Sequence, residues 1–158
     1  MSSFTLLVSD SPLTEIDHSG IAEITVRELK QLYPINENTP VEPWHTMDDE
    51  ARILHAPDES AFGQLAISVC TNPPYDLDLY SEKEYRYWVS GNWEGKFLTD
   101  FADYIKAYIN TSANVQLLIF WAGNGVQELV EQSIHIDEIG PNHLELCRRE
   151  NNLRLQFV

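Results

Sequence analysis

VQLLIFW, residues Val115–Trp121, is apolar at six of its seven positions. A short, continuous apolar run of this kind is typical of a strand that is buried on both faces of a sheet. Just upstream, Phe97–Ile109 repeats Phe, Tyr and Ile at helical spacing, with charged residues off the apolar stripe. This pattern predicts an amphipathic helix whose stripe packs against the sheet.

Three more strands are predicted towards the N-terminus, at Phe4–Val8, Phe62–Cys70 and Tyr85–Val89. Each is a short apolar or aromatic run bounded by polar, Gly or Pro residues, as strands usually are. The segment between Cys70 and Tyr85 begins with Asn72-Pro73-Pro74, which predicts a loop.

Two helices are predicted between the first two strands. Thr25 and Glu28 form a capping-box pattern, and the apolar spacing that follows predicts a helix over residues 22–33. A second, short helix is expected to begin near Thr46–Asp49 and to carry Ala51, Ile53 and Leu54.

Two hairpins are predicted in the C-terminal part. Gly123-Asn124-Gly125 separates the buried strand from Val126–Ile136, in which apolar and polar residues alternate. Asn-Gly between two strands favours a type I′ turn, in which both central residues need positive φ. A phosphate-binding loop is not favoured, because neither a helix start nor Lys-Ser or Lys-Thr follows the glycines. Leu144–Cys147 and Leu153–Phe157 are expected to pair across Asn151-Asn152.

These elements predict an α+β fold, with a mainly antiparallel sheet of about five to seven strands and two or three helices packed on it. The chain has 158 residues, a length that fits one domain with a sizeable core. We therefore expect a single domain over residues 1–158.

The formal net charge is −15, and it is concentrated in the first half. Residues 1–84 hold 16 acidic and 4 basic side chains, and residues 36–60 alone hold seven acids against Arg52. A negative field repels phosphate and attracts basic proteins. Direct nucleic-acid binding is therefore not expected, and a basic protein partner is favoured. Acidity that serves only solubility is the alternative.

Catalytic and metal-binding motifs are not recognisable in the sequence. No histidine stands at metal-binding spacing from another, and neither His45 with Asp48 and Asp49 nor His135 with Asp137 adds a second histidine or a thiolate. The two cysteines, Cys70 and Cys147, lie in apolar runs, where buried free thiols are expected. The sequence thus predicts a non-enzymatic protein without cofactor, metal or catalytic residues.

Candidate partner-binding residues are acids and aromatics in predicted loops. Tyr and Trp dominate binding hot spots, and acids beside them can pair with a basic surface. The alternative is that the aromatics fill the core and the acids are merely solvated. The predicted set is Glu37, Glu42, Trp44, Asp48, Asp49, Glu50, Asp58, Glu59, Tyr75, Asp76, Asp78 and Tyr80.

The first residues, Met1–Thr5, lack the basic and long apolar regions of a signal peptide. The longest apolar run, Leu117–Gly123, is too short to span a bilayer. A cytoplasmic protein without membrane association is therefore expected.

An acidic first half, a Trp- and Tyr-rich middle and the compact end VQLLIFWAGNGVQELVEQSIHI give the chain a distinctive profile. This profile resembles the immunity proteins of bacterial polymorphic toxin systems, including those of contact-dependent growth inhibition. The resemblance implies a toxin inhibitor that binds its cognate toxin, often a nuclease, over the active site or an exosite. An adaptor or structural interaction protein, a nucleic-acid mimic and an enzyme with an unrecognised site stay open as alternatives.

Overall fold

The computed structural model describes residues 2–123 and 125–158. The contacts within the chain divide it into two compact units. Unit 1 comprises residues 1–18 and 63–158, and unit 2 comprises residues 19–62. The sequence predicts a single domain. In the structure, unit 2 is a separate cluster of contacts, and it is inserted in the chain between two strands of unit 1.

Unit 1 is built on a seven-stranded sheet with the order β2-β5-β6-β1-β7-β9-β8. Every neighbouring pair is antiparallel except β8 and β9, which are parallel. This sheet and three α-helices confirm the predicted α+β class. The strands are β1 (Ser2–Ser9), β2 (Ile16–Asp17), β5 (Ala66–Val69), β6 (Tyr85–Ser90), β7 (Gln116–Ala122), β8 (Val130–Ile134) and β9 (Leu153–Phe157).

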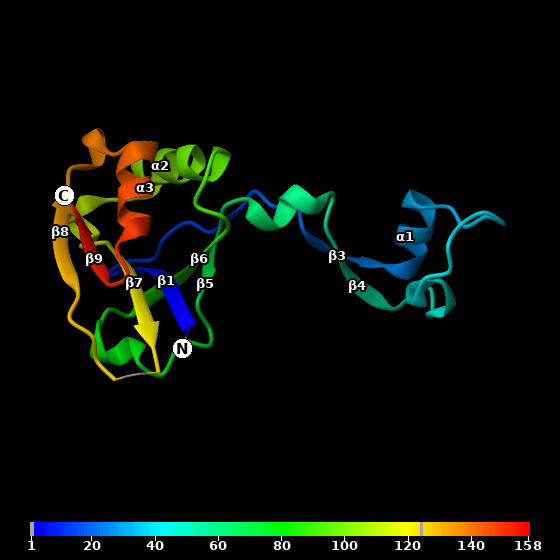
Figure 1. The fold of residues 1–158 in the computed structure, drawn as a ribbon, viewed down its shortest axis with the longest axis horizontal. Coiled ribbons are helices and arrows are strands. Elements are labelled where there is room, and N and C mark those ends of the chain that lie inside the picture. The colour runs from blue at the N-terminus through cyan, green and yellow to red at the C-terminus, as the bar shows by residue number, and fades with distance from the viewer. Residues whose placement is uncertain (1, 124) are drawn as a thin grey trace. The chain divides into compact units, whose positions relative to one another are not determined.

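Helices α2 (Lys96–Tyr108) and α3 (Pro141–Arg149) lie over one face of this sheet (Figure 1). The apolar stripe predicted for α2 is buried: Phe97, Phe101 and Ile105 are at most 1 % exposed and pack into the larger core cluster. That cluster also contains the inward residues of β9. The sequence prediction for α2 is therefore confirmed to within one residue at each end.

The opposite face of the sheet has a smaller cover, made by residues 72–82 and by residues that follow β7. Leu77 and Tyr80 belong to the apolar cluster on this face, and Leu129 packs against it. Strand β7 joins the two faces, because Leu117 belongs to the core under the helices and Leu118 to the second cluster. Burial of this strand on both faces, as the sequence indicated, is confirmed.

The C-terminal hairpin prediction is wrong. Residues 141–149 form α3, with Pro141 at its first turn and Leu144 and Cys147 buried on one side. Leu146, on another side of the helix, is 57 % exposed. The apolar alternation that predicted a strand therefore comes from one buried helical face and one leucine that faces solvent.

The other predicted hairpin is also wrong, because β9 lies between β7 and β8 in the sheet. Strand β8 is shorter than the alternating segment suggested and starts at Val130. Asn124, the centre of the predicted turn, lies outside the described residues. Gly125 does have positive φ, +78°, as the turn chemistry required. The periodicity of this segment predicts a strand, but it does not determine which strand lies beside it in the sheet.

Unit 2 contains a two-stranded antiparallel sheet, β3 (Ala22–Thr25) with β4 (Arg52–His55), and helix α1 (Val26–Leu32). The capping box is confirmed: the Thr25 hydroxyl accepts from the Glu28 amide at 3.2 Å, and the Glu28 carboxylate accepts from the Thr25 amide at 2.8 Å. The helix nevertheless starts at Val26, since residues 22–25 pair with β4.

The prediction of a short helix carrying Ala51, Ile53 and Leu54 is wrong, because residues 52–55 form β4 instead. Ile53 lies directly opposite Ile24 across the ladder, and this tertiary pairing outweighs the local helical spacing. Short 3₁₀ turns, Pro43–Thr46 and Glu59–Gly63, flank the strand, and the latter shortens the predicted strand at 62–70 to β5. Among the described residues, no helix is long and apolar enough to cross a membrane.

Candidate partner-binding surface

The twelve residues predicted for partner binding fall into two groups. Four lie in the cover of the unit 1 sheet, at positions 75–80. The other eight lie in unit 2: Glu37, Glu42, Trp44, Asp48, Asp49, Glu50, Asp58 and Glu59.

Unit 2 has a thin core. Of its described hydrophobic side chains, Val26, Leu29 and Ala61 are buried. Its structure rests largely on backbone contacts to the first turn of α1: the Val26 amide donates to the Ala51 carbonyl at 2.9 Å, and the Arg27 amide donates to the Asp49 carbonyl at 3.0 Å. These bonds satisfy helix-end amides that would otherwise lack partners. They also place the acidic loop 48–50 against α1.

Two acids of this loop are neutralised locally. Lys30 donates to the Asp49 carboxylate at 2.7 Å, and this hydrogen bond lowers the pKa of Asp49. Arg27 forms an ion pair with Glu50. Asp48 accepts from the Glu50 amide at 2.8 Å and shapes the turn. The net negative charge that this loop presents is therefore smaller than its sequence suggests.

Trp44 is half-buried and held by its neighbours. Its indole N–H donates to the Glu42 carboxylate, and its ring meets the His45 ring edge-on at 4.3 Å between centroids. His45 Nδ1 in turn accepts from the Glu42 amide at 3.3 Å. One local cluster is thus formed by Glu42, Trp44 and His45. Its side chains are already held in place before a partner binds.

The remaining acids of unit 2 stay uncompensated. Residues 19–62 hold nine acidic and three basic side chains, and among the described residues only Asp49 and Glu50 of these acids form ion pairs with Lys or Arg. Asp58 is bound by the Ser60 hydroxyl and amide, hydrogen bonds that lower its pKa. Glu37 and Glu59 are exposed.

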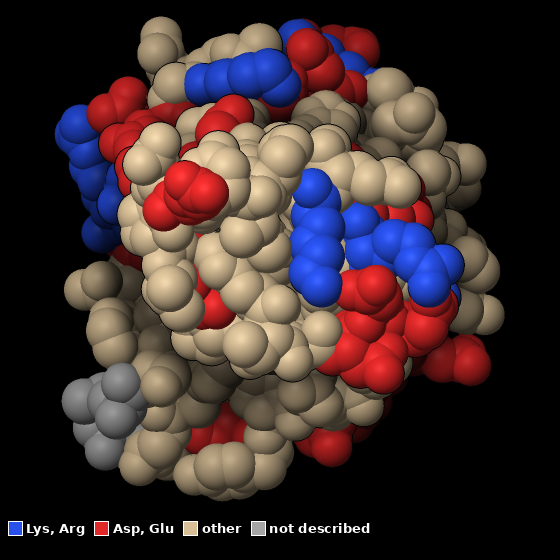
Figure 2. Space-filling view, turned by 90° about the vertical axis from the view of Figure 1, so that its right-hand side faces the viewer, with Lys and Arg blue, Asp and Glu red and all other residues tan. Residues whose placement is uncertain are grey.

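Exposed apolar side chains accompany these acids in unit 2. Val41 is 90 % exposed and Leu54 is 77 % exposed. Leu54 lies directly opposite Glu23 on the outer face of the β3–β4 ladder. Figure 2 shows a face on which Lys and Arg side chains lie beside Asp and Glu, next to a broad uncharged area. Exposed apolar side chains close to acidic ones are typical of a binding surface.

The second predicted group, at 75–80, is divided by burial. Asp76 is 3 % exposed, and its carboxylate accepts from the Gly123 amide at 3.0 Å. Tyr80 is 6 % exposed, and its hydroxyl accepts from the Gln127 amide at 2.8 Å. The two side chains therefore attach Gly123 and Gln127 to the cover of the sheet. We leave Asp76 and Tyr80 out of the binding surface, since a partner cannot reach a buried group.

Tyr75 and Asp78 stay accessible. Tyr75 is 79 % exposed, and Asp78 pairs with Arg86 at 2.6 Å. Asp78 is thus exposed but already compensated.

Asp76→Ala should therefore destabilise the protein by about 2 kcal/mol, because it leaves the Gly123 amide without its acceptor. Asp76→Asn, which keeps an acceptor oxygen, should lose less than half of that. Urea unfolding followed by tryptophan fluorescence measures both. Equal losses in the two variants would contradict the anchoring role of the carboxylate.

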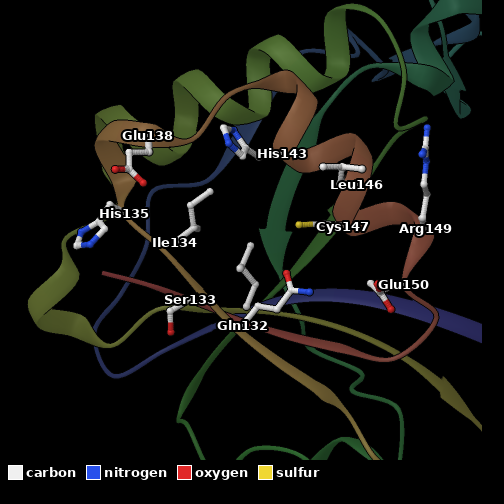
Figure 3. A pocket seen from close by; sticks show the side chains of 11 residues that line it. Gln132, Ser133, Ile134, His135, Glu138, His143, Leu146, Cys147, Arg149 and Glu150 are labelled. Carbon is white, nitrogen blue, oxygen red and sulfur yellow. The ribbon is translucent and has the colours of Figure 1, made fainter.

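A pocket of about 550 Å³ lies between β8 and α3 in unit 1 (Figure 3). Its lining includes His135, Glu138, His143 and Cys147. Burial raises the pKa of Cys147 to about 11, so the thiol is a poor nucleophile at neutral pH. His143 Nδ1 accepts from the Gly140 amide at 3.1 Å and so caps α3. Within the described residues, no group of His, Cys, Asp and Glu side chains is arranged to hold a metal ion.

Sequence reasoning missed the exposed apolar residues of unit 2. Leu54 lies on β4 rather than on the predicted helix, and Val41 lies in the acidic loop between α1 and the 3₁₀ turn Pro43–Thr46. The available signal was the low number of apolar residues between Pro34 and Arg52, which cannot build a core for so long a segment. The chain was compared with protein-family models, with curated proteins and with solved structures, and none of these comparisons gave a match.

Proposed function

We propose that this protein is a non-enzymatic inhibitor that binds a basic protein partner through unit 2 and blocks it. The partner class that best fits is a bacterial toxin domain, in particular a nuclease. In this proposal the protein acts as an immunity protein in the cytoplasm of the toxin-producing cell.

The supporting observation is the surface of unit 2. Its acids are largely uncompensated, and exposed leucine and valine side chains lie among them. A nuclease needs a cationic cleft to hold nucleic acid, and an acidic surface can occupy that cleft by electrostatic complementarity. The apolar side chains would supply the desolvated centre of the contact, and the acids would supply its rim.

Co-expression tests this proposal directly. The tagged protein is produced together with the product of the gene next to its own, and complex formation and protection of the host from that product are measured. A stable complex with a basic, toxic neighbour, whose toxicity the protein suppresses, is the expected result. A toxic neighbour that is neither bound nor suppressed would overturn the proposal.

The triple variant Glu23→Gln, Glu37→Gln, Glu59→Gln should weaken this complex about tenfold at low salt, since each exposed charge contributes roughly 0.5 kcal/mol. The loss should shrink at high salt, where surface charges are screened. Isothermal titration at two salt concentrations gives both values.

The matched control removes three exposed acids from unit 1 instead: Glu94→Gln, Asp103→Asn and Asp137→Asn. It changes the net charge by the same amount and should weaken binding by less than threefold. Similar losses in the two triple variants would show that net charge, rather than the surface of unit 2, governs the affinity.

A further inference from the structure

We propose that a second copy of this chain pairs with the free edge of β8, so that two unit 1 sheets join into one continuous antiparallel sheet. This inference does not depend on the inhibitor function, because it concerns unit 1 and a different surface.

Strand β8 is the last strand of the seven-stranded sheet. Its even-numbered residues bond to β9: the Val130 amide donates to Asn152, the Val158 amide donates to Ile134, and both contacts are 2.9 Å long. Because successive residues of a strand point their backbone groups in opposite directions, Glu131 and Ser133 direct theirs away from β9. The amide of His135, which follows the strand, points the same way, but its carbonyl already accepts from the Glu138 amide at 3.0 Å. The free edge therefore offers a row of donors and acceptors to another strand.

Natural edge strands are commonly protected by Pro, by charged side chains, Lys above all, or by a covering segment. The sequence of β8, VEQSI, contains neither Pro nor Lys, and its one charged residue is Glu131. Its residues 130–133 are exposed, and among the described residues no strand pairs with its outer edge.

The second copy is favoured as the occupant because the edge is complementary to itself. In an antiparallel pairing centred on Ser133, each Ser133 faces its symmetry mate and each Glu131 faces His135 of the other copy. The Glu131 carboxylate pairs with Arg154 at 2.9 Å through one oxygen, and the other oxygen can then accept from the imidazole N–H across the strands. Such an isologous pairing closes after two copies and forms up to about four backbone hydrogen bonds.

The pocket between β8 and α3 adds side-chain contacts to this pairing. Gln132 and Ile134 line its floor on β8, and Leu146 of α3, which is 57 % exposed, lines its wall (Figure 3). In the same register Gln132 of one copy faces Ile134 of the other. The two pockets then meet at the dyad, and the exposed leucines approach the interface.

Net charge opposes the association, since each copy carries a formal −15. The test is therefore sedimentation equilibrium in about 0.5 M salt, where screening limits this repulsion, at protein concentrations up to about 1 mM. The wild-type chain should show a reversible monomer–dimer equilibrium. A wild-type chain that stays monomeric throughout this range would overturn the proposal.

Ser133→Pro should raise the dimer dissociation constant at least about a hundredfold, because proline removes the outward N–H and its ring obstructs pairing. The fold should persist, since this N–H makes no bond to β9 and proline is tolerated on an edge strand. Ser133→Ala keeps the N–H and should dimerise like the wild type. A folded Ser133→Pro variant with wild-type dimerisation would refute β8 pairing.

His135→Glu supplies a second test that leaves the backbone of β8 intact. It places two acids opposite each other in the proposed register and should weaken the dimer about tenfold. His135→Gln keeps an N–H donor and should stay within about threefold of the wild type. If His135→Glu dimerised as well as His135→Gln, the register centred on Ser133 would be wrong.

Discussion

Gly91→Ala should destabilise the protein by about 3–4 kcal/mol, a large share of the 5–15 kcal/mol that holds a typical domain folded. Gly91 joins β6 to the segment before α2 and has φ of +132°, a backbone conformation that L-residues rarely adopt. A Cβ at this position would lie 2.5 Å from a ring carbon of Phe97 and 2.7 Å from the Gln64 carbonyl oxygen. Neither neighbour can move freely, because Phe97 is buried in the core and the oxygen belongs to the backbone.

Gly95→Ala is the matched control for this substitution. Gly95 also has positive φ, +54°, but its Cβ would meet no atom within 4 Å. It should therefore cost only the backbone strain, about 1–2 kcal/mol. Thermal and urea unfolding of the two variants separate strain from steric overlap. A loss in Gly91→Ala no larger than that in Gly95→Ala would show that the core adjusts around the added methyl group.

Phe101→Ala should cost about 3–5 kcal/mol, the range for removing a fully buried phenylalanine. Phe101 is completely buried on the inner side of α2. Its ring lies 5.5 Å from the Trp93 ring and 5.9 Å from the Phe97 ring, both in edge-on geometry. The substitution removes apolar burial and two aromatic contacts together.

Tyr108→Ala on the same helix is the control for Phe101→Ala. Tyr108 is 50 % exposed and touches Tyr104 at 5.2 Å between ring centroids. We expect it to lose no more than about 1 kcal/mol. Urea denaturation gives both values, and comparable losses would contradict the assignment of the α2 stripe to the core.

The candidate site was only partly predictable from sequence. The acidic character of residues 36–60 is a property of composition, and Glu37 and Glu59 are indeed exposed. Whether an acid is free or paired is decided by side chains distant in sequence, as Asp49 with Lys30 shows. Asp76 looked like a loop acid, but the amide that it binds belongs to Gly123, 47 residues away.

The fold shows the same division. Helix α2 and strand β7 were predictable, because their apolar patterns are long and unambiguous and both are deeply buried. Strand β4 and helix α3 were misassigned, since short segments with two or three apolar residues fit either period. For these, pairing or packing with distant elements decided the conformation.

By itself the sequence determined the α+β class, the buried strand β7, the amphipathic helix α2 and the acidic character of the first half. These features depend on local periodicity and on composition, and both can be read from a short stretch of sequence without knowing its tertiary contacts. Only the tertiary structure decided that β9 separates β7 from β8, that residues 19–62 form their own unit, and that Asp76 and Tyr80 are buried. Those outcomes depend on hydrogen bonds and packing between segments that are distant in sequence. The free energy of these contacts cannot be inferred from a local sequence pattern.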